Sequence, residues 1–199
     1  MELWDQIKHE DWSYVSASVN WPLRLWNFDK HYQFIGGAGG AGVGYHLPGT
    51  IGAALANRKY GRISVSIIGD GDFMMGNTAV WTAAHYRIPI LFLVANNRSF
   101  YNDEVHQERV AVARNRPVDN KWIGQRIADP DIDIAMVARG QGAKGFGPCN
   151  NAGELEKALK EAVAVVEAGG VAVVDARILG GYSPATAAAM ARGKADRGT

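Results

Sequence analysis

The middle of the chain alternates between apolar runs and a segment with helical periodicity. Residues 63–68 are rich in β-branched side chains and lie between two glycines, which is typical of a strand buried in a parallel sheet. From Asn77 to Arg87 apolar residues recur at helical spacing until Pro89 ends the pattern, so a helix is predicted there. Residues 90–95 predict a second strand. Because strand–helix–strand crossovers are right-handed, both strands should end at the same edge of the sheet.

Further elements repeat this alternation along the chain. A capping-box sequence from Asn151 to Glu154 marks the start of an amphipathic helix, and two glycines mark its end. The other predicted elements are helices at 132–139 and 155–166 and strands at 32–35, 143–146 and 171–178. We therefore expect an α/β fold, a doubly wound and mostly parallel sheet with helices on both faces, in a single domain over residues 1–199.

Oxygen-bearing residues follow the two central strands. Asp70 stands between Gly69 and Gly71 at the end of the first strand, and Asn97 follows the second. Mg²⁺ is usually bound by one or two protein carboxylates together with neutral oxygens and substrate phosphate. Asp70, Asn97 and the backbone carbonyl of Ser99 are therefore candidate metal ligands, and the glycines would let the backbone approach a phosphate.

A glycine-rich segment over residues 36–48 permits two interpretations. It contains a G-x-G-x-x-G pattern between Gly37 and Gly42, as in dinucleotide-binding folds. That fold expects an acidic residue about twenty positions later, and the nearest candidate, Asp70, comes too late. A nicotinamide- or flavin-binding oxidoreductase domain stays open as an alternative, as does a non-catalytic assembly subunit. His46, near the end of the segment, either approaches a bound cofactor or has a packing or capping role.

The Gly69-Asp70-Gly71 triplet and the pair Asn96 and Asn97 together resemble the diphosphate-binding motif of thiamine diphosphate enzymes. The likeness extends from about residue 32 to 178 and is greatest to the acetolactate synthase and benzoylformate decarboxylase group. It implies thiamine diphosphate and Mg²⁺ as cofactors, with Val43 holding the cofactor in a bent form and the carbonyl of Ala41 facing its 4′-amino group. The implied cofactor-binding residues are Ala41, Gly42, Val43, Gly69, Asp70, Gly71, Asp72, Phe73, Asn97 and Ser99.

The resembling enzymes also need a pyrimidine-binding module with an activating glutamate, normally upstream in the same chain. No glutamate here, such as Glu104, Glu108 or Glu154, has a matching context. We expect that module on a separate partner subunit, in a hetero-oligomer with two copies of each chain or more, or else that this chain is a fragment. The implied reaction cleaves or forms a carbon–carbon bond next to a carbonyl, as in a 2-oxo acid decarboxylase, an acyloin lyase or a carboligase. Its substrate would be a 2-oxo acid, acyloin or aldehyde.

Residues 98–130 are the most polar and least regular part of the sequence. Long loops of this kind are often lids, and this one begins beside the candidate metal site. Phe100 and Tyr101 either line the reaction space or pack beneath the loop. Tyr101 and His106 are the candidate catalytic residues of this chain, and a solvated side chain is the alternative for His106.

Four of the six tryptophans fall within residues 1–30. Tryptophan is enriched at protein interfaces, so this stretch is a candidate interface segment, with core packing as the alternative. Residues 180–199 are rich in alanine and glycine and are expected to form a flexible tail or a helix that a partner orders.

Composition narrows the classes of function. The chain has 199 residues, 47% of them hydrophobic, and a net charge of +1 without any basic run, which argues against nucleic-acid binding. The lone Cys149 excludes an internal disulfide. No apolar run approaches the ~20 residues that span a bilayer, and residues 1–10 do not resemble a signal peptide. We therefore expect a cytoplasmic protein without a membrane partner.

Overall fold

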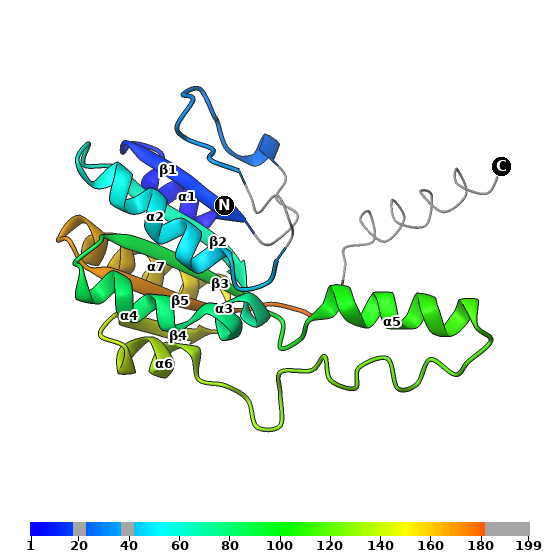
Figure 1. The fold of residues 1–199 in the computed structure, drawn as a ribbon. Coiled ribbons are helices and arrows are strands. Elements are labelled where there is room, and N and C mark those ends of the chain that lie inside the picture. The colour runs from blue at the N-terminus through cyan, green and yellow to red at the C-terminus, as the bar shows by residue number, and fades with distance from the viewer. Residues whose placement is uncertain (18–22, 37–41, 182–199) are drawn as a thin grey trace.

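The described strands form one five-stranded parallel sheet (Figure 1). The computed structural model describes residues 1–17, 23–36 and 42–181. Its strands are β1 (Trp12–Ala17), β2 (Ile63–Gly69), β3 (Ile90–Asn96), β4 (Lys144–Cys149) and β5 (Val171–Arg177), in the spatial order β1-β2-β3-β5-β4. Its helices are α1 (Glu2–Ile7), α2 (His46–Arg58), α3 (Asp70–Gly76), α4 (Thr78–His85), α5 (Tyr101–Ala113), α6 (Ile134–Gly140) and α7 (Ala152–Glu167), with a 3₁₀ turn at Leu23–Leu25. The expected α/β fold is confirmed.

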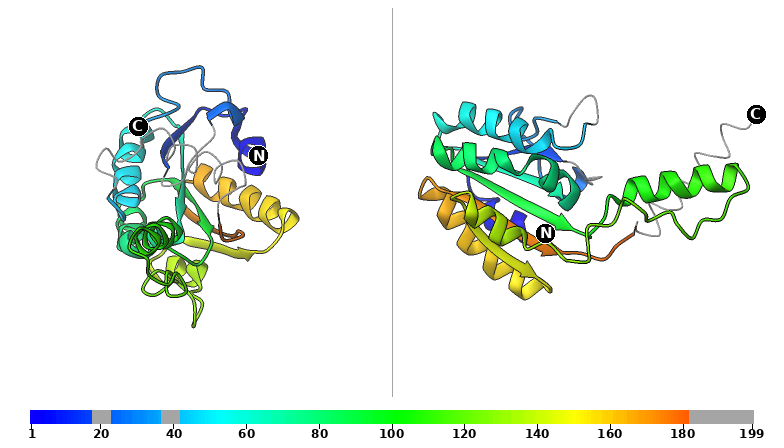
Figure 2. Two further views of the ribbon diagram at one scale, coloured as in Figure 1. Left: turned by 90° about the vertical axis from the view of Figure 1, so that its right-hand side faces the viewer. Right: turned by 60° about the horizontal axis from the view of Figure 1, so that its bottom comes forward.

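Helices cover both faces of the sheet, as seen along its strands in Figure 2. Successive residues of a strand point to opposite faces, so the central strands are apolar on both sides. In β3, Leu91 and Leu93 pack with α1 and α7, whereas Phe92 and Val94 pack with α2, α3, α4 and α6. Two apolar layers therefore hold β2, β3 and β5 in place and fix where these strands end.

The N-terminal tryptophans contribute to the first of these layers. Trp12 lies on β1, is 1% exposed and meets Trp4, Trp26 and Phe28 at ring-centroid distances of 5.5, 5.3 and 5.4 Å. Core packing thus accounts for three of the four tryptophans, while Trp21 lies outside the described residues. Contact of residues 1–30 with a partner stays a prediction.

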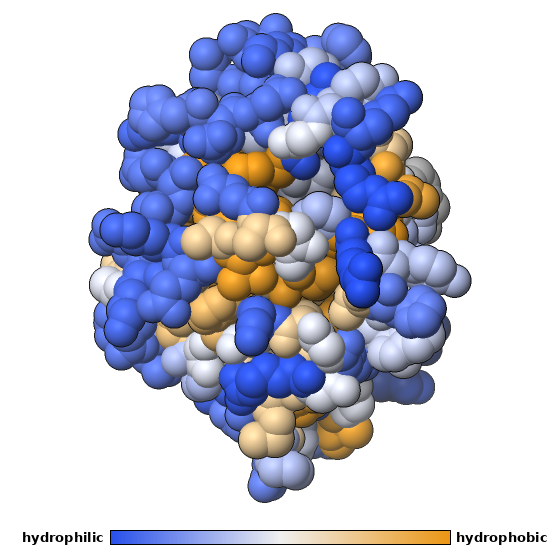
Figure 3. Space-filling model, turned by 90° about the vertical axis from the view of Figure 1, so that its left-hand side faces the viewer, coloured by the Kyte–Doolittle hydropathy of each residue, from blue (hydrophilic) through white to orange (hydrophobic). Residues whose placement is uncertain are grey.

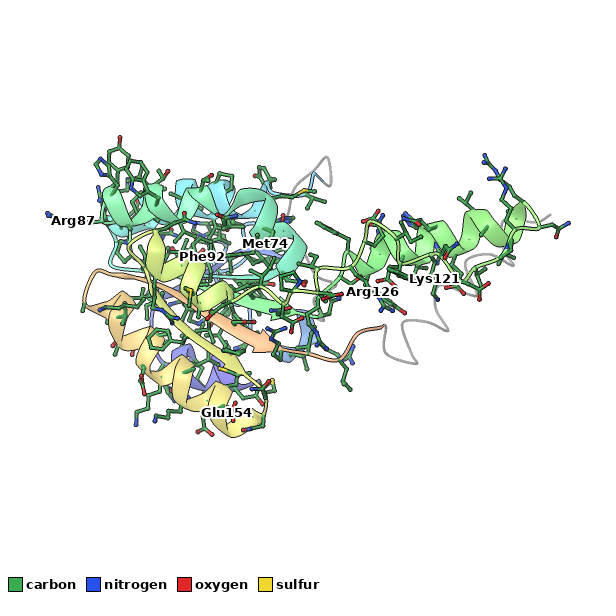
Figure 4. All side chains as sticks on the ribbon, turned by 90° about the horizontal axis from the view of Figure 1, so that it is seen from below. Met74, Arg87, Phe92, Lys121, Arg126 and Glu154 are labelled. Carbon is green, nitrogen blue, oxygen red and sulfur yellow. The ribbon has the colours of Figure 1, made fainter. Side chains whose placement is uncertain are left out.

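Residues 98–130 are more ordered than the sequence suggested. Instead of an irregular loop, they begin with α5, a helix of 13 residues that extends away from the sheet in both Figure 1 and Figure 2. Glu104 is its single buried residue among those described, so it has no apolar stripe and gives no periodic signal. The chain then returns along α5, where Lys121 forms an ion pair with Glu108 at 2.6 Å. We call residues 101–130 the arm; its Lys121 and Arg126 are labelled in Figure 4.

The helix expected from Asn77 to Arg87 is found as α4, and a separate short helix, α3, precedes it from Asp70. Gly69 has extended backbone angles and precedes α3, whose first turn carries two aspartates that favour a helix start. The glycines of this stretch obscured α3 in the sequence. The strand predicted at 32–35 is also reduced to one bridge, between Tyr14 and Phe34.

The other predicted elements are found close to their expected bounds. At α7, Asn151 accepts a hydrogen bond from the Glu154 backbone N–H at 3.0 Å, as a helix cap should. The end of the molecule opposite the arm, where the strands begin, has an apolar centre surrounded by polar residues (Figure 3). No helix in the described part of the chain has the length and apolarity needed to cross a membrane.

Candidate functional site at the carboxyl edge of the sheet

Strands β2 and β3 end side by side. Gly69 pairs with Ala95 in the parallel register, so Asp70 and Asn96 leave the sheet at the same edge, next to Asn97. In open α/β sheets, ligands bind outside the carboxyl ends of the strands. The two motifs that are 27 positions apart in sequence, at Asp70 and Asn97, therefore meet at the edge where a ligand is expected.

Asp70 is almost completely withdrawn from solvent, with 2% of its surface exposed. Its Oδ2 atom is buried and has no hydrogen-bond partner among the described residues. Burial raises the pKa of Asp70 to about 6, while nearby backbone N–H groups, including those of Arg98 and Ser99, favour the charged form. A buried carboxylate oxygen without a partner is unfavourable unless a cation neutralises it. This atom therefore fits a metal ligand.

The two asparagines after β3 have different partners. Asn96 is buried and donates a hydrogen bond from Nδ2 to Oδ1 of Asp175 on β5, at 2.9 Å. Asn97 is half-buried, and its Oδ1 accepts the backbone N–H of Ser99 at 3.0 Å. An amide oxygen has a second lone pair, so Asn97 can still bind a metal ion in this position. The site thus offers one carboxylate, one amide oxygen and a backbone carbonyl at Ser99, a donor set that suits Mg²⁺.

The turn between the candidate ligands has a strained backbone. Arg98 has φ +60°, in the left-handed region that non-glycine residues seldom adopt, and its N–H donates to Oδ1 of Asn96 at 3.2 Å. Its guanidinium lies 3.7 Å from Asp131, which also pairs with Arg177 at 3.2 Å. The Asn96 bond ties the turn to the end of β3, and the ion pairs connect it to the base of the arm.

The glycine after Asp70 makes room for an aromatic ring. A Cβ atom added at Gly71 would lie 2.3 Å from the ring of Phe100, so the two residues are in close contact. The expectation that Gly71 admits a phosphate stays a prediction, and in this structure Phe100 lies over it. Phe73 is fully buried in the core, so it can contribute its backbone alone.

Asp72 connects α3 to the glycine-rich segment. Its Oδ1 accepts a hydrogen bond from the backbone N–H of Gly44, and its Oδ2 lies 2.6 Å from Nδ1 of His46, the first residue of α2. Both side chains are buried. Val43, just before this contact, is half-exposed, whereas Ala41 lies outside the described residues. This contact, which the sequence did not reveal, joins α3 to the residues that directly follow Gly42 and Val43.

The candidate catalytic residues of this chain lie on the arm. Tyr101 is the first residue of α5, and His106 lines a hollow of about 430 Å³ between α5 and residues 116–121. Their proposed roles stay predictions. Within the described ranges, no cluster of three or more His, Cys, Asp or Glu side chains could hold a metal ion, so any metal here must depend on amide and backbone oxygens beside Asp70.

The sequence left the role of His46 open and missed the supporting roles of Asp175 and Glu104. His46 pairs with Asp72, Asp175 with Asn96, and Glu104 accepts a hydrogen bond from Ser99 Oγ. Asp175 carried a signal, because it is a charged residue inside an otherwise apolar strand. Burial raises the pKa of the Asp175 carboxyl, which Asn96 opposes through its hydrogen bond.

The burial of Asp70 predicts a pH-dependent cost to stability in the metal-free protein. Between pH 3.8 and about 6 the folded chain keeps a proton that the unfolded chain has released, so the free energy of unfolding falls as the pH rises through this window. At pH 7 the cost is about 2–3 kcal/mol. We expect Asp70→Asn to raise the free energy of unfolding by roughly that amount at pH 7 and by much less near pH 4. Urea unfolding with a chelator measures both values, and an equal gain at both pH values would contradict the prediction.

Comparison with known proteins gives a consistent result. A family model described as "Thiamine pyrophosphate enzyme, C-terminal TPP binding domain" matches residues 15–176. Benzoylformate decarboxylase of Pseudomonas aeruginosa is 34% identical over 172 residues, covering 80% of this chain and 28% of that protein. The acetolactate synthase large subunit of Porphyra purpurea is 28% identical over 159 residues, covering 80% and 24%.

Solved structures show the same fold. Benzoylformate decarboxylase from Polynucleobacter necessarius superposes with a TM-score of 0.72 at 22% identity, covering 92% of this chain and 33% of that one. The 4-hydroxybenzoylformate decarboxylase of Rhodococcus jostii gives a TM-score of 0.67 at 23% identity, covering 87% and 30%. The chain therefore spans between about a quarter and a third of the length of the relatives it matches.

Proposed function

The chain belongs to the thiamine pyrophosphate enzyme family, and from this premise we propose that it binds the diphosphate end of thiamine diphosphate through Mg²⁺. The observation that carries the proposal is the buried, unpartnered Oδ2 of Asp70 at the strand edge that Asn97 also reaches. Asp70, Asn97 and the carbonyl of Ser99 would hold the ion, while the backbone of Gly71, Asp72 and Phe73 would meet the diphosphate.

The bound cofactor supplies a nucleophilic carbon and an electron sink for bond changes next to a carbonyl. This chain would contribute binding and orientation. Its proposed reaction class is cleavage or formation of a carbon–carbon bond in a 2-oxo acid, acyloin or aldehyde. The named relatives, a decarboxylase and a synthase, support this class without selecting between its members.

The proposed partner is a pyrimidine-binding module that carries the activating glutamate, on another subunit of a hetero-oligomer or elsewhere in a longer chain. The arm supports this proposal. It extends from the sheet beside the candidate site, and side chains such as Val110, Val112 and Ile123 are more than half exposed on it. Exposed apolar side chains beside an incomplete site are suited to contact with a second module.

A cofactor titration tests the proposed function. The chain should bind thiamine diphosphate with Mg²⁺ present and lose most of this affinity when a chelator removes the ion, because the buried Asp70 carboxylate needs a cation between itself and the diphosphate. Calorimetry or ligand-observed NMR can measure the two affinities. Parallel titrations with NAD⁺ and FAD serve as controls. Binding of either dinucleotide in place of thiamine diphosphate would favour the oxidoreductase alternative and contradict the proposal.

A further inference from the structure

The contact between Asp72 and His46 joins the two segments that would enclose the cofactor. Nδ1 of His46 and Oδ2 of Asp72 are 2.6 Å apart, and neither atom has a hydrogen bond to any other described residue. Both side chains are more than nine-tenths buried. Removing one member of such a pair leaves the other buried and uncompensated, so each depends on its partner.

The same carboxylate also fixes the backbone beside Val43. Oδ1 of Asp72 accepts the N–H of Gly44, whose φ of +87° is readily adopted by glycine alone. A Cβ atom at Gly76 would lie 2.7 Å from the Gly44 carbonyl oxygen, so the end of α3 and the glycine-rich segment are in direct backbone contact. Gly44 is therefore held on both its amide and carbonyl sides, immediately after Val43.

Asp72 is also acidic where a diphosphate is proposed to bind. A free carboxylate would repel the anion, but here both of its oxygens face the glycine-rich segment. One oxygen accepts an N–H group and the other is beside an imidazole nitrogen. The side chain thus serves the contact between the segments.

We propose that Asp72 and His46 are positioning residues that fix where Val43 lies relative to the metal site. The chain would therefore favour a cofactor that carries rings as well as a diphosphate. The inference rests on the proposed function and deepens it. Asp70 would anchor the diphosphate end, and the Asp72–His46 pair would place the side chain against which the rings bend. Neither residue needs to touch the cofactor with its side chain for this role.

Two ligands separate positioning from simple support of the fold. Thiamine diphosphate carries both rings and diphosphate, whereas methyl diphosphate carries the diphosphate ester alone. For His46→Leu, we expect the affinity for Mg²⁺–thiamine diphosphate to fall about tenfold or more, and that for Mg²⁺–methyl diphosphate to stay within about threefold. His46→Gln retains a side-chain N–H that can reach Asp72 and should restore most of the lost affinity.

Calorimetric titration of the full chain, with circular dichroism to verify folding, measures these values. His46→Phe, which keeps a ring but removes the nitrogen that faces Asp72, serves if His46→Leu does not fold; its loss should also be confined to thiamine diphosphate. Equal losses for both ligands, or no loss in a folded variant, would overturn the positioning role. If the unchanged chain binds neither ligand with Mg²⁺, the proposed function fails and this inference fails with it, a result distinct from altered selectivity in the variants.

Discussion

Asp70→Ala is expected to abolish the magnesium-dependent binding of thiamine diphosphate. The substitution removes the one carboxylate in the candidate donor set, whose Oδ2 has no other partner among the described residues. Loss of a charged ligand should weaken binding by at least about 100-fold, or ~2.7 kcal/mol. Calorimetric titration at a fixed Mg²⁺ concentration measures the loss, and affinity for Mg²⁺–methyl diphosphate should fall in parallel because both ligands share the metal.

A matched control separates this effect from a general change in charge. Asp5 lies on α1, where its exposed carboxylate pairs with Lys8. Asp5→Ala also removes one carboxylate charge, but from the face of the sheet that lies opposite α3. This substitution should leave the cofactor affinity unchanged. If Asp70→Ala retained the affinity of the unchanged chain, the assignment of the metal site would be wrong.

Trp12→Ala is expected to cause the largest loss of stability. Trp12 is buried at the centre of a ring cluster and packs edge-to-face against Trp4, Trp26 and Phe28. Truncation of a buried tryptophan removes apolar contacts and leaves a cavity, which typically costs about 3–5 kcal/mol. The free energy of unfolding, from urea titration followed by circular dichroism, should fall by that amount.

Trp81→Ala is the control for this prediction. Trp81 is 54% exposed on α4 and stacks on His85 at the surface. Its removal should change the free energy of unfolding by less than about 0.5 kcal/mol. A similar small loss in Trp12→Ala would mean that the N-terminal strand contributes little to the core, and that its tryptophans are better explained by contact with a partner.

The candidate site combines two costs to stability that serve no purpose in the fold alone. Asp70 is buried with an unpartnered oxygen, and Arg98 has a left-handed backbone. Strained or unsatisfied groups of this kind concentrate at functional sites, where the surrounding structure holds them in place. Asn96 and Asp175 provide this support from the neighbouring strands.

Elements with a strong pattern were predicted correctly. The apolar runs at β2, β3 and β5 identified core strands, and the right-handed crossover placed Asp70 and Asn97 at a common edge. Elements whose patterns are weak were missed or misplaced. α5 has no apolar stripe, and the glycine-rich stretch of α3 has no helical pattern. β1 was not recognised, because Trp12 and the other N-terminal tryptophans indicated an interface as readily as a core.

The sequence by itself determined the fold class, the order of the central strands along the chain and the polar residues at their ends. These features follow from local periodicity and from the right-handed crossover between strands. Both can be recognised from residues that are close together in the sequence. The tertiary structure alone decided which polar groups meet. Asp72 with His46 and Asn96 with Asp175 are 26 and 79 positions apart, and such contacts depend on how helices and strands pack rather than on any local pattern.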